Sequence, residues 1–182
     1  MEHHLTFREF GDQFAKLSKE AFIARFPTPI LVVDFEGLET PPKELPDSPA
    51  PPSNALTQFT PGHDEKLNQV AVAPLVKSKR NPMQKAVTLG RAAANDIVVP
   101  HGVISKLHAF FKKDPASGEL SITDANSRFG TAAEGHILLP GEPYLLTKKT
   151  SIVFARYVQA LLFFPAEFFQ HMHLMLHLGR EK

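Results

Sequence analysis

The sequence predicts an all-β sandwich with a helical extension at its N-terminus and a helix at its C-terminus. Between residues 67 and 165, short apolar runs of strand length alternate with turn signals such as Asp114-Pro115, Ser117-Gly118 and Pro140-Gly141. Many short strands separated by Gly and Pro turns are typical of a sandwich. Residues 1–26 and 166–182 instead carry apolar side chains at helical spacing.

The composition excludes several classes of protein. The chain has 182 residues, 43% of them hydrophobic, which is enough for a sizeable core. A net charge of +1 argues against a general binder of nucleic acid or anionic membranes. With no cysteine, disulfides, thiol catalysis and Cys-based zinc sites are excluded. The N-terminus does not resemble a signal peptide and no stretch suits a bilayer core, so we expect a cytoplasmic protein with no membrane contact.

The N-terminal region divides into a helical part and a linker. Thr6 and Glu9 form a capping-box pattern, and Ser18 can cap a second short helix that ends before Pro27. The apolar run 29–35 has strand length and fits either an added strand at a sheet edge or part of a separate subdomain. Residues 37–66 are rich in proline and polar residues, so we expect a linker. The predicted boundaries are therefore 1–36 for the extension with its candidate strand and 37–66 for the linker.

The remaining chain divides into a β domain over 67–165 and a helix over 166–182. The expected strands are 70–76, 86–89, 97–99, 107–111, 119–123, 135–139, 144–146, 151–154 and 160–164. Pro165 suits the first turn of the final helix. That helix is apolar nearly all round, so we expect it to be buried on two sides, against the N-terminal helix or against a second copy of the chain.

Three short motifs carry the chemistry of the β domain. Gly90-Arg91 ends one strand, Ser105, Lys106 and His108 lie on the next loop, and the run 124–131 (Asp-Ala-Asn-Ser-Arg-Phe-Gly-Thr) forms another. Two guanidinium groups, an ammonium and a hydroxyl, if they converge, make a site for a doubly charged tetrahedral anion. A phosphorylated side chain is such an anion.

The three motifs, in this order, resemble the forkhead-associated (FHA) domain, a reader of phosphothreonine peptides, of the kind found in bacterial single-domain FHA proteins. The family pattern is Gly-Arg, then Ser-x-x-His, then Asp-x-x-Ser-x-Asn-Gly-Thr, and the resemblance covers roughly residues 67–164. It implies an FHA-type β-sandwich with no cofactor. One position departs from the pattern: Phe129 stands where the family has an Asn that holds the main chain of the bound peptide.

The resemblance also implies a role for each motif residue. The phosphopeptide-binding residues would be Arg91 as a bidentate phosphate clamp, Ser105 as a hydroxyl donor, Lys106 as a further contact, and Arg128 and Phe129 beside the pocket. Residues that shape the site would be Gly90, His108, Asn126 and Gly130.

These features predict a non-catalytic module that recognises phosphothreonine in Ser/Thr-kinase signalling. The partner would be a phosphorylated protein, either a Ser/Thr kinase or its substrate. The alternative is an FHA scaffold that assembles or dimerises through its apolar terminal helices, with weakened phosphopeptide binding.

The sequence gives less support to a catalytic or metal site than to phosphopeptide binding. Ser105 and His108 could suggest a nucleophile and its base, but no Gly-x-Ser-x-Gly elbow is present. His173 and His177 share a helical face without an acidic ligand beside them, so no metal site is expected.

Overall fold

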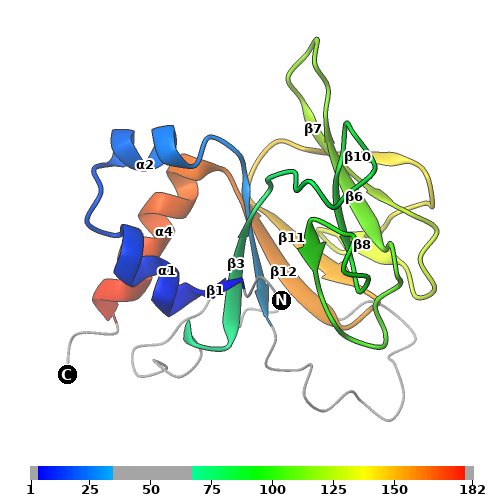
Figure 1. Ribbon diagram of the computed structural model, residues 1–182, viewed down its shortest axis with the longest axis horizontal. Coiled ribbons are helices and arrows are strands. Elements are labelled where there is room, and N and C mark those ends of the chain that lie inside the picture. The colour runs from blue at the N-terminus through cyan, green and yellow to red at the C-terminus, as the bar shows by residue number, and fades with distance from the viewer. Residues whose placement is uncertain (1–3, 35–66, 179–182) are drawn as a thin grey trace.

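Two β-sheets pack face to face, and helices cover part of the outer face of the larger sheet (Figure 1). The computed structural model describes residues 4–34 and 67–178. The predicted linker, 37–66, lies outside the described residues. The predicted fold class, an all-β sandwich with an N-terminal helical extension and a C-terminal helix, is confirmed. Among the described residues, no helix combines the length and apolar character needed to cross a bilayer.

The larger sheet has seven strands. Their spatial order is β1 (Leu5–Thr6), β3 (Val70–Pro74), β2 (Ile30–Asp34), β12 (Val158–Phe163), β11 (Thr150–Phe154), β8 (Thr131–Ala133) and β9 (His136–Ile137). The smaller sheet has five, in the order β10 (Pro143–Leu146), β7 (Leu120–Asp124), β6 (Ala109–Lys113), β4 (Val87–Gly90) and β5 (Ile97–Val98). The β4–β5 pair is parallel, and the other pairs are antiparallel.

Strand β2 lies inside the larger sheet, between β3 and β12, and not at its edge. Leu31 and Val33 face the core between the two sheets, while Ile30 and Val32 face the core beneath the helices. Because both faces of the strand are buried, its residues are apolar without alternation. This burial explains why the run 29–35 is continuously apolar. The position also resolves the two alternatives left open for this run, since neither an edge strand nor a separate subdomain is observed.

The N-terminal extension forms two short helices, α1 (Phe7–Phe14) and α2 (Lys19–Arg25), preceded by β1. The predicted capping box is confirmed: the backbone N–H of Glu9 donates to Thr6 Oγ1 (3.2 Å), and the backbone N–H of Thr6 donates to Glu9 Oε2 (2.8 Å). The Ser18 hydroxyl caps α2 by accepting the N–H of Ala21 (3.2 Å). The predicted second short helix, capped by Ser18 and ending before Pro27, is therefore confirmed.

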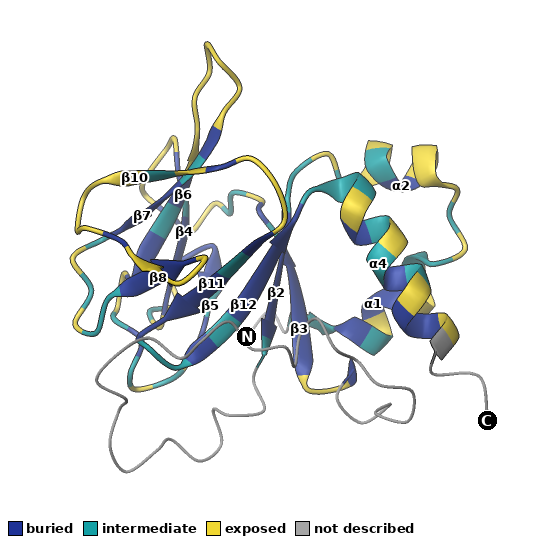
Figure 2. Cartoon of the chain, turned by 180° about the vertical axis from the view of Figure 1, so that it is seen from behind, coloured by how far each residue is buried: buried dark blue, intermediate teal, exposed yellow. Residues whose placement is uncertain are grey.

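The C-terminal helix α4 (Pro165–Leu178) packs on α1, α2 and the larger sheet, and Figure 2 shows the buried and exposed sides of these helices. Phe168 is fully buried, with ring centroids 5.7 Å from Phe7, 5.6 Å from Phe10 and 5.8 Å from Phe163. Of the two neighbours expected for this helix, the N-terminal helices are the ones observed. Dimerisation through the terminal helices stays a prediction.

Several strands differ from the predictions, and the two-residue strand β1 was not expected because it lies within the stretch predicted to be helical. β8 was not expected, because Ala132 and Ala133 have low intrinsic preference for strands. The expected strand 135–139 is reduced to two residues in β9. These small strands matter for the site, because the loop that enters β8 carries Arg128 and Phe129.

Candidate functional site

Gly90, the last residue of β4, lets two loops meet. A Cβ at this position would lie 2.3 Å from the carbonyl oxygen of Lys106 and 2.8 Å from Asn95 Nδ2. Because no side chain fits there, the backbone of the β4–β5 loop can bond directly to the next loop. The N–H of Arg91 donates to the carbonyl of Ser105 (3.0 Å), and the N–H of Ala92 donates to the carbonyl of Lys106 (3.2 Å). Arg91 and Lys106 both have exposed side chains.

The buried side chain of Asn95 bonds to both of these loops. Its Nδ2 donates to the carbonyls of Ala92 (2.8 Å) and Lys106 (2.6 Å), and the residue is 4% exposed. No role was predicted for Asn95. An Asn within a short polar turn is the only signal that pointed to it, since such side chains often bond to nearby backbone groups.

The neighbouring Asp96 ties the loop that contains Ser78 to the site. Its carboxylate accepts the N–H groups of Ser78 (2.6 Å) and Thr88 (2.7 Å) and a bond from the Asn81 amide. Burial alone would raise the pKa of Asp96, but these hydrogen bonds outweigh burial and lower the pKa below its ordinary value. The carboxylate therefore stays charged and holds the base of the loop that carries Arg91.

His108 is a buried brace between two loops. The N–H of Ser105 donates to His108 Nδ1 (3.1 Å), so Nδ1 carries no proton and Nε2 donates to the carbonyl of Gly130 (3.1 Å). Burial lowers the pKa of His108, and this effect exceeds the opposing ones of Gly130 and Asp124. The ring is therefore neutral and held as one tautomer by bonds to both loops.

This geometry leaves His108 poorly placed to act as a base for Ser105. The ring nitrogen that faces Ser105 is already occupied by that residue's backbone N–H. The Ser105 hydroxyl oxygen accepts the N–H of Arg128 (3.0 Å) and thereby joins the third loop. A hydroxyl that accepts one bond keeps its own proton for another acceptor.

The third loop is held by Asp124, whose carboxylate is turned inward. It accepts bonds from the Ser127 N–H (2.9 Å), the Ser127 hydroxyl (2.7 Å) and the Thr131 hydroxyl (2.6 Å). Asn126 (φ 59°) and Gly130 (φ 78°) adopt left-handed backbone conformations, which suit Asn and Gly. The structural positions predicted for Asn126 and Gly130 therefore have a backbone explanation.

Arg128 and Phe129 lie at the outer end of this loop. The guanidinium carbon of Arg128 is 4.8 Å from the centroid of the Phe129 ring, a cation–π distance. Phe129 is partly buried and packs against the core between the sheets. The three loops that carry the predicted binding residues are thus joined directly, because the N–H groups of Arg91 and Arg128 both bond to Ser105.

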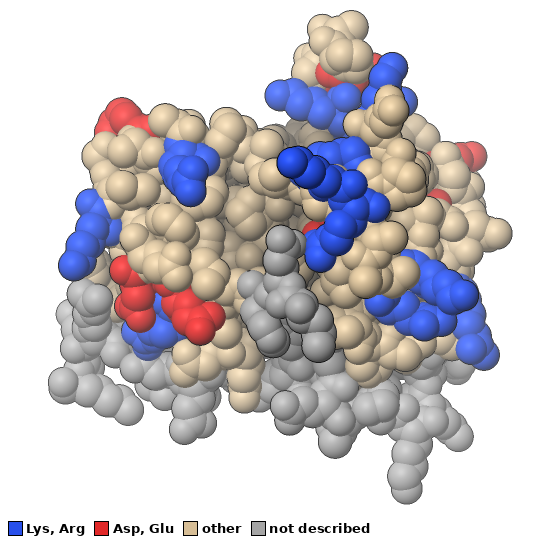
Figure 3. All heavy atoms as spheres, in the orientation of Figure 1, with Lys and Arg blue, Asp and Glu red and all other residues tan. Residues whose placement is uncertain are grey.

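The charge of this end is positive. Arg91, Lys106 and Arg128 are exposed, whereas the nearby Asp124 is 1% exposed and bonded to internal donors. On the face shown in Figure 3, Lys and Arg side chains gather over the sandwich, and much of the visible acidic surface lies on the helical side. Three exposed cationic side chains and a hydroxyl therefore lie on loops that are bonded to one another.

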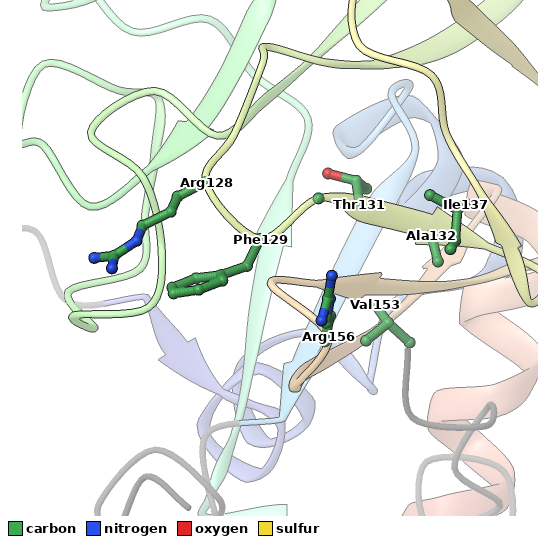
Figure 4. A pocket seen from close by; sticks show the side chains of 8 residues that line it. Arg128, Phe129, Thr131, Ala132, Ile137, Val153 and Arg156 are labelled. Carbon is green, nitrogen blue, oxygen red and sulfur yellow. The ribbon is translucent and has the colours of Figure 1, made fainter. Parts of the chain in front are cut away.

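A pocket of about 160 Å³ lies beside Phe129 (Figure 4). Its lining includes Arg128, Phe129, Ala132, Ile137, Val153 and Arg156. Among the described residues, no group of three or more His, Asp or Glu side chains could hold a metal ion.

Comparison with known proteins identifies the region that contains these loops. Residues 87–155 match the family model of the FHA domain. This stretch is similar to FHA domains. The match lies within the predicted 67–165, and the outer domain boundaries stay a prediction. No curated protein sequence matches the chain.

Solved FHA domains are similar to this chain over part of its length. An FHA domain of an Arabidopsis thaliana hypothetical protein is 28% identical, with a TM-score of 0.40, over 43% of this chain and 66% of that one. The N-terminal FHA domain of Saccharomyces cerevisiae Rad53p, in complex with a phosphothreonine peptide, is 21% identical, with a TM-score of 0.44, over 57% and 91%. The MEK1 FHA domain, in complex with a HOP1 peptide, is 23% identical, with a TM-score of 0.41, over 51% and 87%.

Proposed function

We propose that this FHA domain binds a phosphothreonine segment of a partner protein without catalysing a reaction. The Ser105 hydroxyl carries the proposal. Its oxygen is occupied by the N–H of Arg128, so its proton can be given to a phosphate oxygen. Solved FHA domains that resemble this chain are bound to phosphothreonine peptides, which supports the same assignment.

In this proposal the phosphate sits between the three loops. Arg91 supplies two parallel N–H donors, Ser105 a hydroxyl donor, and Lys106 and Arg128 further positive charge. Hydrogen bonds to a charged group contribute about 1.5–3 kcal/mol each, about twice those between neutral groups. The buried braces His108, Asn95 and Asp124 hold the loops before the ligand arrives, so little ordering cost is left for binding.

Phe129 changes how the rest of the peptide is held. An amide at this position could bond the peptide main chain, and a phenyl ring cannot. The missing bond weakens binding by about 1–3 kcal/mol if the peptide group stays unpaired. We therefore expect Phe129→Asn to bind phosphopeptides more tightly than the natural chain, as measured by calorimetry. Equal or weaker binding by Phe129→Asn would mean that the ring itself contacts the peptide.

The biological setting follows from the ligand. Phosphothreonine is made by Ser/Thr kinases, so the proposed partner is such a kinase or its substrate, and the domain acts as a signalling adaptor. Assembly through the terminal helices is not favoured by any contact in the structure, because Phe7, Phe10, Phe22 and Phe168 bury their rings within one chain.

The test is calorimetric titration with a degenerate phosphothreonine peptide pool and the matching unphosphorylated pool. We expect binding of the first pool only. Arg91→Ala should weaken it by about 100-fold or more, which corresponds to about 3 kcal/mol. Arg25→Ala removes an exposed arginine from α2 and serves as the matched control. Unchanged affinity in Arg91→Ala, or equal binding of both pools, would refute the proposal.

A further inference from the structure

Strand β10 is the longest open edge of the sandwich. Each sheet has two edge strands, and β1, β9 and β5 are two residues long, whereas β10 has four. β10 pairs with β7 on one side, and in the described part of the chain no strand lies on its other side. In Figure 2 it lies on the side of the sandwich away from the helices. An open edge of this kind can accept a further strand.

The pairing of β6 with β7 sets which residues of β7 can bond to β10. The N–H of Asp114 donates to the carbonyl of Glu119 (2.8 Å), so these two residues form a hydrogen-bonded pair of the antiparallel ladder. Such pairs recur at every second residue, so Ser121 and Thr123 also bond to β6. The residues that alternate with them direct their backbone groups the other way, toward β10.

Strand β10 therefore uses alternate residues for β7 and leaves the others open. Tyr144 and Leu146, which lie opposite Ile122 and Leu120, bond to β7. The N–H and C=O of Leu145 consequently point to the outer side of the strand, and so does the C=O of the preceding proline, which has no N–H to leave unpaired. The side chain of Leu145 is itself 47% exposed.

Exposed aliphatic side chains gather near this edge. Seven large hydrophobic side chains are exposed in the described part of the chain, and three of them are Ile137, Leu139 and Leu145. Ile137 belongs to β9, the edge strand of the larger sheet, and residues 138–142 connect β9 to β10. Exposed apolar surface of this kind often marks a protein interface.

We propose that β10 pairs in antiparallel orientation with β10 of a second copy of this chain, with Leu145 opposite Leu145 of that copy. This inference goes beyond the proposed function. Each Leu145 then donates its N–H to the other and accepts the other's N–H in return, while the C=O of Pro143 faces the N–H of Thr147. The two leucine side chains meet on the same face of the joined sheet, where directly opposite residues contact each other.

The charges that flank β10 favour this register. Glu142 lies one residue before the strand and Lys148 two residues after it, and both are exposed. With Leu145 on the two-fold axis, Glu142 lies opposite Lys148 of the second copy, and the same pair recurs at the other end of the strand. Neighbouring registers place each of these charges opposite an uncharged residue. The edge is therefore complementary in charge to a second copy of itself.

The two-fold pairing turns the two candidate phosphate sites in opposite directions. Pro143 pairs with Thr123, and the next residue, Asp124, holds the third loop, so β10 begins at the end of the sandwich that carries that loop. In an antiparallel pair the second copy begins its β10 at the opposite end. Under the proposed function, such a dimer joins two phosphorylated molecules and does not bind two sites of one molecule.

Light scattering coupled to gel filtration, over a range of protein concentrations, tests the pairing. We expect the mass of the natural chain to approach twice that of one copy as the concentration rises, without any phosphopeptide. Leu145→Lys places like charges opposite each other on the axis and should weaken dimerisation about 10-fold or more. Leu174→Lys changes an exposed leucine of α4 and should leave dimerisation unchanged, so it is the matched control.

An exchange of charges tests the register itself. Glu142→Lys and Lys148→Glu should each dimerise more weakly than the natural chain, because like charges then face each other. Combining both substitutions in one chain should restore dimerisation. A mixture of the two single variants should form heterodimers, which would also show that each variant is folded.

Several outcomes would overturn the proposal. One is the mass of a single copy at every concentration up to about 1 mM. Another is a dimer that Leu145→Lys leaves unchanged or that Leu174→Lys disrupts, since the interface would then lie elsewhere, in the second case on the terminal helices. A third is failure of both the double variant and the mixture to restore dimerisation. Because no phosphopeptide is present, failure of the proposed phosphate site would change none of these results.

Discussion

Replacing Gly90 by alanine should destabilise the fold and disable the site together. The added Cβ would lie 2.3 Å from the Lys106 carbonyl oxygen, whereas real Cβ contacts are rarely under 3.0 Å. The two loops must therefore separate by at least about 0.7 Å, the difference between these distances. That movement breaks the 3.2 Å bond from Ala92 and lengthens the 2.6 Å bond from Asn95. Strain from overpacking adds about 1–3 kcal/mol, and each lost bond about 1 kcal/mol, so we expect about 2–4 kcal/mol in all.

Thermal unfolding measures the effect, with Gly102→Ala as the control. Gly102 lies on the β5–β6 loop, and a Cβ there would have no atom within 4 Å. We expect Gly90→Ala to melt about 5–15 °C below Gly102→Ala, from about 2–4 °C per kcal/mol for a domain of this size. Phosphopeptide binding should also be lost at temperatures where the variant is folded, because Ser105 and Lys106 move. Melting within about 1 °C of the control would show that the contact at Gly90 is not as tight as described.

Three further changes have defined outcomes. Lowering the pH from 6.5 to 4 should reduce the free energy of unfolding by up to about 3 kcal/mol, because burial and then Lys149 lower the pKa of His171 to about 4 and only the unfolded chain gains the proton. In urea titrations across this pH range, the free energy of unfolding of His171→Phe should vary less with pH than that of the natural chain. The same pH dependence in both proteins would contradict the lowered pKa of His171. Phe168→Ala should lose about 3–5 kcal/mol in the same assay, since the ring is fully buried; a loss under 1 kcal/mol would be inconsistent with that packing. Asp96→Asn should melt several degrees lower than the natural chain. The N–H groups of Ser78 and Thr88 now bond to different carboxylate oxygens of Asp96, and an amide offers only one acceptor oxygen. An unchanged melting temperature would show that these bonds to Asp96 do not stabilise the fold.

The sandwich was predictable from the sequence because its strands are short and its turns carry Gly and Pro. The capping box of Thr6 and Glu9 likewise predicted where the first helix starts, because this pattern involves only residues close together in the sequence. The place of β2 in the sheet was not predictable. Its partners, β3 and β12, are distant in the chain, and a continuous apolar run does not reveal which strands lie beside it.

The motifs predicted which residues lie on the three loops, and the structure joins these loops by hydrogen bonds. The binding role of Ser105 and the structural roles of Gly90 and His108 stay predictions. Asn95 and Asp96 escaped assignment because they act through backbone carbonyls and N–H groups, which leave no pattern of partner residues in the sequence. Arg156, which lines the pocket beside Phe129, had no assignment either, because it lies on the turn between β11 and β12, far from the motifs in the sequence.

The internal position of β2 also has consequences for truncated fragments of the chain and for folding during synthesis. A fragment that starts at residue 67 would lose this strand and expose the hydrogen-bonding edges of both β3 and β12. Two open apolar edges favour pairing with other copies, so such a fragment should aggregate. During synthesis, the backbone groups on one edge of β2 have no strand partner until β12 is made, more than 120 residues later. The sandwich therefore closes only when nearly the whole chain is available.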